Sequence, residues 1–301
     1  MSQKQNHNRQ RTKNSHWVPQ AYLRAFAAEH DAERIWRFSH TKGDAQLKLI
    51  EKVAYKRHLY STHDDTTGSL NDALEKKLAD LEQWFGSPIW RTLQRDVVDL
   101  SWQPLRKIVS LLAATMFLRN PRTLEEHSKM HEHLVKLFSQ FNEPPDRVTV
   151  GDRTFDFDDT SWETFRAADT DDVKKIWFRQ IESAVIFAKI FMNMRWSMMM
   201  APRPAFITSD APITFCHPSL EFSGINDPET TIHFPISPTR VLNMDNFHSE
   251  PANQYYPCDD ECYVTTNLLI WRSAIEYMFT HRHPDYIMDE LLRKAEAEGY
   301  A

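Results

Sequence analysis

Three polar side chains stand among apolar ones near the start of the chain, in the segment SHWVPQAYLRAF. Gln20 and Arg24 are four residues apart, so they share one face of a helix expected to begin at Pro19. His16 precedes this helix, near the end where backbone N–H groups are free. A histidine can transfer protons and an arginine can hold an anion. These residues therefore either line a pocket together or make structural pairs and ties.

Two carboxylates, Glu75 and Glu82, are seven residues apart and share a face of a second expected helix. They flank Leu78, at the border of the apolar stripe, where a carboxylate is either solvated or paired. Pairing with Arg24 or Arg119 is the structural interpretation. In the functional alternative, a glutamate acts as a general base or binds a divalent metal ion, so a metal cofactor stays open.

Two arginines, Arg119 and Arg122, bracket Pro121 within an otherwise helical stretch. The proline should break or kink the helix near Arg119, and a kink re-aims the neighbouring side chains. Two guanidinium groups at such a place suit a phosphate or a carboxylate, since arginine binds both in a bidentate manner. The structural alternative is a salt bridge at the helix end.

Ser209 and Asp210 follow the expected buried strand AFIT and precede a proline turn. Loops at strand ends commonly present catalytic residues, which makes Asp210 the strongest single candidate for a catalytic carboxylate. Its structural alternative is to cap the turn. Ser209 could act as a nucleophile activated by His16, although no G-x-S-x-G motif surrounds it.

Other histidines and cysteines have spacings that occur in metal sites, but we expect ordinary structural roles for them. The two cysteines of CDDEC are expected to be core or surface thiols. These groups are His127 with His131, Cys258 with Cys262, and His281 with His283 and Asp285.

The pattern of helices and strands expected from the sequence indicates an α+β protein. The protein is expected to be mostly helical, with a small antiparallel sheet in the C-terminal half. Hairpins are expected at 34–50 and around Gly151-Asp152, and the short strands of the sheet at 195–244. Helices are expected at 69–95, 101–141 with its break, 161–193, 262–282 and 285–298.

The composition limits the functional classes. The 301 residues include six glycines and contain neither GxGxxG nor a P-loop motif, and the net charge of −6 gives no general attraction to nucleic acid. Residues 1–14 are expected to form a disordered basic tail, and the alternative role for this tail is a non-specific contact with phosphate. Residues 15–301 are expected to form a single globular domain. Three cysteines and a longest apolar run of 11 residues predict a cytoplasmic protein with no membrane span.

Several of these motifs together resemble a bacterial family of unknown function, DUF4238. HWVPQAYLRAF resembles its opening signature, and LEKKLADLE resembles its glutamate-bearing helix. FLRNPR resembles its Arg-x-Pro element, FITSDAP its Thr-Ser-Asp-x-Pro element, and FPISP and Asn267 also fit. The family usually has asparagine where this chain has Ala211. The family has no established activity, so the resemblance implies a shared fold and candidate positions only.

The leading hypothesis is a hydrolase of phosphodiester bonds, such as a nuclease acting on RNA or DNA. Its catalytic residues would be His16, Glu82, Asp210 and Ser209. Its substrate-binding residues would be Gln20, Arg24, Arg119, Arg122 and Asn267. A module that binds a nucleotide or another small anion without turnover is the second hypothesis, and a purely structural ion-pair network is the third.

Overall fold

The computed structural model describes residues 14–64, 66–140, 147–150, 153–156, 159–219 and 224–297. The α-helices of these residues are α1 (Gln20–Leu23), α2 (Ala73–Glu82), α3 (Pro88–Arg95), α4 (Gln103–Leu118), α5 (Pro121–Phe138), α6 (Asp159–Ala167), α7 (Thr170–Glu182), α8 (Ala184–Asn193), α9 (Asp260–Ser273) and α10 (Pro284–Ala297). The strands are β1 (Asn14–His16), β2 (Arg34–Ser39), β3 (Ala45–Leu49), β4 (Tyr55–Arg57), β5 (Thr62–His63), β6 (Leu70–Asn71), β7 (Arg147–Val150), β8 (Arg153–Asp156), β9 (Arg195–Met200), β10 (Thr208–Ser209), β11 (Thr214–Cys216), β12 (Thr231–Ser237), β13 (Arg240–Asp245), β14 (Gln254–Pro257) and β15 (Tyr277–Thr280).

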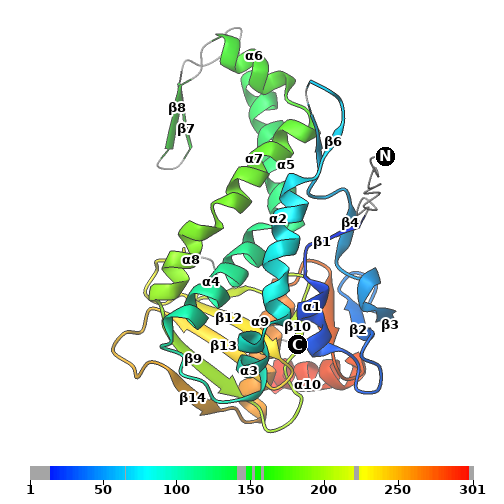
Figure 1. The fold of residues 1–301 in the computed structure, drawn as a ribbon, viewed down its shortest axis with the longest axis vertical. Coiled ribbons are helices and arrows are strands. Elements are labelled where there is room, and N and C mark those ends of the chain that lie inside the picture. The colour runs from blue at the N-terminus through cyan, green and yellow to red at the C-terminus, as the bar shows by residue number, and fades with distance from the viewer. Residues whose placement is uncertain are drawn as a thin grey trace, which may run out of the picture.

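The largest sheet lies in the lower half of the molecule in Figure 1, while α5, α6 and α7 extend away from it toward the top. Its five strands have the order β11-β12-β13-β9-β14, and all its pairs are antiparallel except β14 with β9. The expected basic tail lies outside the described residues, apart from Asn14, which begins β1. The turn of the expected hairpin at Gly151-Asp152 also lies outside them, between β7 and β8.

The α+β class fits, but the expected small sheet confined to the C-terminal half is wrong. A second sheet of order β10-β15-β2-β3 joins strands from both ends of the chain, and two-stranded sheets occur elsewhere. The segment Tyr277–Thr280, expected inside a helix, is strand β15, which pairs with β2. Its apolar run is too short to distinguish a buried strand from a helix by periodicity, so long-range pairing decides.

The five-stranded sheet is covered by apolar side chains on both faces. Successive residues of β13 point to opposite faces: Leu242 and Met244 belong to one buried hydrophobic cluster, and Val241 to a second. Likewise, Met198 of β9 lies in the first cluster and Met199 packs against the second. Because both faces are buried, the sequences of these strands are runs of apolar residues and do not alternate between apolar and polar.

The break between α4 and α5 lies where Pro121 predicts it. Helix α4 ends at Leu118, and Pro121 is the first residue of α5, where its missing N–H has no cost. The Asn120 side chain accepts a hydrogen bond from the Arg122 backbone N–H at 3.0 Å and so caps the new helix. The break places Arg119 and Arg122 in two different environments.

Tyr22 of α1 fastens the N-terminal helix to the late strands. Its ring stacks on Phe234 and meets Phe85 edge to face. Its buried hydroxyl donates to the Pro235 carbonyl at 2.8 Å and lies 2.8 Å from the Thr208 hydroxyl. Segments about 200 residues apart in sequence are thereby held together, as the position of α1 beside β10 in Figure 1 reflects.

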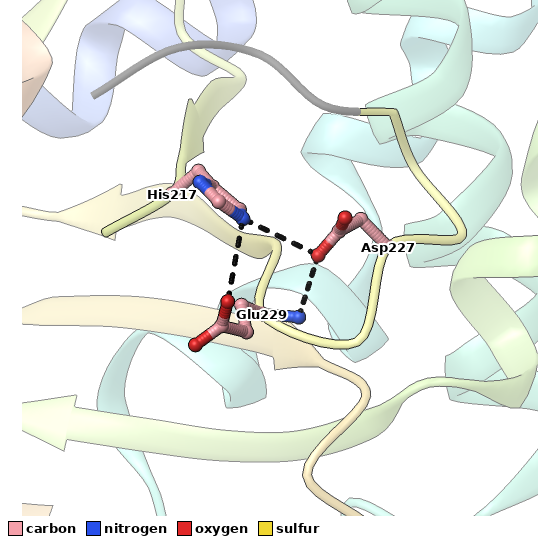
Figure 2. A group of neighbouring side chains, drawn as sticks. All are labelled: His217, Asp227 and Glu229. Carbon is pink, nitrogen blue, oxygen red and sulfur yellow. Dashed lines mark hydrogen bonds and ion pairs between the residues drawn. The ribbon is translucent and has the colours of Figure 1, made fainter. Parts of the chain in front are cut away.

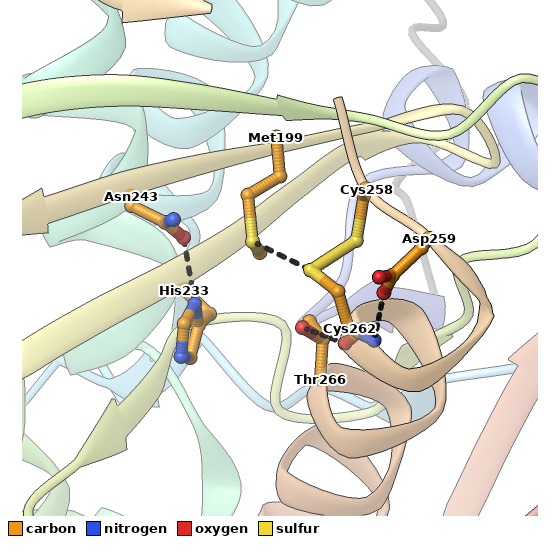
Figure 3. The surroundings of a disulfide bond; sticks show 7 residues. All are labelled: Met199, His233, Asn243, Cys258, Asp259, Cys262 and Thr266. Carbon is orange, nitrogen blue, oxygen red and sulfur yellow. Dashed lines mark hydrogen bonds between the residues drawn. A yellow bond between two sulfur atoms is a disulfide. The ribbon is translucent and has the colours of Figure 1, made fainter. Parts of the chain in front are cut away.

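The two cysteines of CDDEC form a disulfide, so the expectation of separate thiols is wrong. Cys258 and Cys262 are bonded at the start of α9, with their Cα atoms 5.5 Å apart (Figure 3). Asp259 caps this helix by accepting from the Cys262 backbone N–H at 2.9 Å. Met199 of β9 contacts the Cys262 sulfur at 3.7 Å, so the disulfide packs against the sheet.

Candidate functional site

Six polar side chains from four elements meet near the N-terminal helix, and we call them the polar cluster. Strand β1 and helix α1 bring the first three, helix α2 brings the two glutamates, and the end of α4 brings the arginine. The members are Ser15, His16, Gln20, Glu75, Glu82 and Arg119.

Arg119 is the buried centre of the cluster, with 1% of its side chain exposed. Its Nε donates to the Trp17 carbonyl at 2.8 Å, and its Nη1 donates to Glu82 Oε1 at 2.7 Å. The Tyr60 hydroxyl donates to the Arg119 carbonyl at 2.8 Å and satisfies an orphan acceptor at the helix end. Nη2 is buried and has no hydrogen-bond partner, so this guanidinium keeps unused donor capacity.

Glu75 also has unused hydrogen-bonding capacity. Its Oε2 atom and the Ser15 hydroxyl are both buried and make no hydrogen bond of ordinary geometry, although the two side chains lie close enough for the hydroxyl to act on the carboxyl group. Burial raises the pKa of Glu75 above its ordinary value of 4.5. The Ser15 hydroxyl and the Arg119 guanidinium act in the opposite direction, while the Glu82 carboxylate adds to the increase. Glu75 therefore holds its proton more tightly than a solvated glutamate.

His16 is shifted toward its neutral form. Burial lowers its pKa below the ordinary value of 6.5, although the nearby Glu82 and the Glu51 carbonyl oppose this shift. Nε2 lies 3.2 Å from the Glu51 carbonyl, which can only accept, so Nε2 carries the proton. Nδ1 then presents its lone pair to the Gln20 amide at 3.4 Å. At neutral pH His16 is therefore an uncharged base held by two neighbours.

Asp210 lies outside the polar cluster. Its buried carboxylate accepts from the backbone N–H groups of Ile275, Glu276 and Tyr277 at 2.8, 2.9 and 3.0 Å. Burial raises the pKa of Asp210 to about 6, although these three hydrogen bonds act to lower it. The carboxylate ties β10 to the segment before β15. Its backbone carbonyl accepts from the Trp17 indole at 2.9 Å, which links it indirectly to the cluster.

Three more residues predicted to belong to the site make their contacts outside the polar cluster. The buried Ser209 hydroxyl accepts from the Ala211 backbone N–H at 3.1 Å. Asn267 accepts from the Ile207 N–H at 3.0 Å and donates to the Ala205 carbonyl at 2.9 Å, so it clamps this loop. Arg24 is half-exposed and lies 3.7 Å from Glu33.

A cavity of about 520 Å³ lies next to the break between α4 and α5, and we call it the central pocket. Leu118, Asn120 and Arg122 line it, while Arg119 between them belongs to the polar cluster. Ala211, which follows Asp210, also lines the pocket. Arg272 of α9 adds a second guanidinium to its wall.

The other histidines singled out from the sequence have ordinary partners. His127 lies 2.7 Å from the Gln180 amide oxygen, His131 2.7 Å from the Phe165 carbonyl, and His281 2.5 Å from the Ala27 carbonyl. None of them belongs to a group of three metal-type ligands within the described residues.

Sequence reasoning did not single out a different trio. His217, Asp227 and Glu229 place one ligand atom each within 4.8 Å of one another. His217 precedes Asp227 by ten residues and Glu229 by twelve, a spacing that no compact motif marks. The sequence feature that could have indicated these ligands is the pair of carboxylates in Asp227-Pro228-Glu229, just before strand β12.

Fold and site together define an α+β protein with a partly buried polar cluster and a cavity at the break between α4 and α5. The chain matches the family model described as a protein of unknown function (DUF4238) over residues 14–284, and it belongs to that family. Neither a curated protein nor a solved structure matches the chain. Across the described ranges, none of the helices combines the length and the apolar character that crossing a membrane requires.

Proposed function

We propose that the protein is a hydrolase that cleaves a phosphodiester bond by acid–base chemistry in the polar cluster. The observation that carries this proposal is the convergence of His16, Glu75 and the unpartnered Arg119 Nη2 in one cluster, and the lowered pKa of His16 and the raised pKa of Glu75 agree with it. Environments that separate a base from an acid in this way are typical of catalytic sites. The unpartnered Nη2 of Arg119 supplies a third function, a donor for an anionic oxygen.

In the proposed reaction, His16 Nδ1 takes a proton from water as the water oxygen attacks phosphorus. The bond from phosphorus to the leaving oxygen breaks, and Glu75 donates its proton to that oxygen. Arg119 Nη2 donates to a non-bridging oxygen, whose negative charge increases in the transition state. Proton exchange with solvent then restores neutral His16 and protonated Glu75.

The charges of the cluster favour a singly charged substrate. The Arg119 and Glu82 charges cancel within their 2.7 Å pair, and a protonated Glu75 adds no charge. A phosphodiester carries one negative charge, so transferring it from water to this cluster without net charge costs less than transferring a doubly charged phosphomonoester. A bound anion also raises the pKa of Glu75 further, which keeps the proton on the acid.

Binding of a nucleotide or another small anion without turnover is the second candidate function, and the central pocket favours it. Arg122 and Arg272 both line this cavity of about 520 Å³, a size that suits a small ligand. The pocket wall includes none of the side chains of the polar cluster. Binding there therefore does not require the acid–base groups.

A cleavage assay tests the hydrolase proposal. Purified protein is incubated with labelled single- and double-stranded RNA and DNA, and with bis(4-nitrophenyl) phosphate. We expect His16→Gln and Glu75→Gln each to lower the rate by about 10²-fold or more, because an amide cannot transfer the proton. The matched controls are His63→Gln and Glu182→Gln, at exposed residues that pair with Asp171 and Lys77.

Three outcomes separate the candidates. Cleavage that both cluster variants lose and both controls keep supports the hydrolase. Absence of cleavage by folded wild-type protein on every substrate contradicts it. If a nucleotide then raises the melting temperature of wild-type protein but not of Arg122→Ala, the central pocket is a binding site.

A further inference from the structure

One histidine and two carboxylates converge beside the central pocket, and we call them the His217 trio (Figure 2). His217 follows β11, while Asp227 and Glu229 lie in the segment before β12. His217 Nε2 lies 3.3 Å from Asp227 Oδ1 and 3.8 Å from Glu229 Oε2. All three side chains point toward a common centre in the figure.

These separations are close to those of metal ligands. In a tetrahedral zinc site with bonds of about 2.0–2.1 Å, neighbouring ligand atoms are about 3.3 Å apart. The ligand atoms of the trio lie within 4.8 Å of one another, so they must draw closer to hold one ion, and Glu229 is mostly exposed and can move inward. Asp227 is already fixed, because its Oδ1 accepts from the Glu229 backbone N–H at 2.8 Å.

The second nitrogen of His217 has a partner of the kind that metal-binding histidines use. The Ser219 hydroxyl lies 2.6 Å from Nδ1 and can accept the Nδ1 proton, which would leave the Nε2 lone pair for a metal ion. The Ser219 backbone N–H also lies 3.2 Å from Nδ1, and this contact favours the other tautomer, with Nε2–H donating to Asp227. Metal binding would thus compete with an ordinary histidine–carboxylate pair.

We propose that the His217 trio binds one divalent transition-metal ion, with Zn²⁺ preferred. An imidazole nitrogen with two carboxylate oxygens suits Zn²⁺ or Mn²⁺ better than Mg²⁺, which prefers oxygen ligands alone. The two carboxylates carry two negative charges, which a divalent ion neutralises. This site lies outside the polar cluster and does not depend on the proposed acid–base hydrolysis.

The site's position suggests its use. His217 also lines the central pocket, so an ion bound to it would lie at the pocket wall. Three protein ligands leave a fourth position for a water molecule or for an anionic oxygen of a pocket ligand. Arg122 and Arg272 line the same cavity, so a phosphate or carboxylate group could meet the metal and a guanidinium together.

Calorimetric titration of the metal-free protein, without a histidine tag, tests the site. We expect Zn²⁺ to bind in a 1:1 ratio and Mg²⁺ to bind at least tenfold more weakly. His217→Ala should weaken Zn²⁺ binding about 100-fold, and Glu229→Gln about tenfold. Glu229 is mostly exposed, so its variant tests the site even if the His217 variant fails to fold.

The matched control is His63→Ala, because His63 also pairs with an aspartate, Asp171, at 2.8 Å, but has no third ligand in the described residues. This variant should bind Zn²⁺ as wild type does. Equal Zn²⁺ affinity in wild type and Glu229→Gln, or no Zn²⁺ binding by wild type, would overturn the proposal. Either result would leave the hydrolase proposal unaffected, since that site uses other residues.

Discussion

Burial distinguishes the Glu82–Arg119 pair from an otherwise similar ion pair on the same helix. Glu82 accepts from Arg119 at 2.7 Å, and Lys77 donates to Glu182 at 2.6 Å. Only 1% of the Arg119 side chain is exposed, against 67% for Lys77. Removing the partner of a buried charge leaves that charge uncompensated, whereas an exposed charge is simply solvated.

At the residue scale, Glu82→Gln should therefore lower the free energy of unfolding by about 2–4 kcal/mol, because Arg119 stays buried. Glu182→Gln should change it by less than about 1 kcal/mol. Urea unfolding measures both, and a double-mutant cycle with Arg119→Met isolates the pairwise coupling. Equal effects of the two glutamate variants would contradict the view that burial gives the pair its importance.

The residues of the polar cluster show what helical spacing can and cannot predict. Glu75 and Glu82 share a face of α2 as their seven-residue separation implies, and pairing of Glu82 with Arg119 was one of the two interpretations offered. Asp210 could not be placed in this way. Its carboxylate meets the backbone of Ile275 to Tyr277, and that contact depends on a long-range pairing of β10 with β15.

At the element scale, helix α1 is too short to be stable alone, so tertiary contacts must hold it. Tyr22→Phe removes the hydroxyl that donates to Pro235 and contacts Thr208, and it leaves those buried groups without this partner. We expect a loss of about 1–3 kcal/mol in the free energy of unfolding. Denaturant unfolding measures the loss.

The control for this substitution is Tyr286→Phe, since 64% of Tyr286 is exposed. It should change stability by no more than about 0.5 kcal/mol. If Tyr22→Phe has an equally small effect, the hydroxyl does not fasten α1 to the late strands. The sequence predicted the helix from Pro19 and the apolar spacing, but it contained no signal for its partner about 200 residues away.

At the scale of the whole molecule, the distribution of strands was the main feature that local patterns missed. The hairpin of β2 and β3 was expected from alternation and the KGD turn, and it is present. Its incorporation into one sheet with β15 and β10 was not expected, because pairing partners far apart in sequence leave no local mark. The helix break at Pro121 was predicted because its cause is local.

Global stability should depend on pH through Asp210. Its pKa is about 6 in the folded chain and 3.8 ordinarily, so the folded state binds the proton more tightly. This contribution is fully present below about pH 4 and is lost as pH rises to about 6. The stability of wild type relative to Asp210→Asn should therefore decrease by roughly 2.5 kcal/mol between pH 4 and pH 7. Urea unfolding at several pH values measures this difference in stability. If the difference between the two proteins does not change with pH, the pKa of Asp210 is not raised in the folded state.

The pH dependence of kcat/KM on bis(4-nitrophenyl) phosphate tests whether His16 acts as the base and Glu75 as the acid. Lowered from 6.5, the pKa of His16 gives a limb that rises with pH. Raised from 4.5, the pKa of Glu75 gives a limb that falls with pH. We predict an acidic optimum in wild type, and loss of the falling limb in the residual activity of Glu75→Gln. A falling limb that persists in Glu75→Gln would show that Glu75 is not the acid.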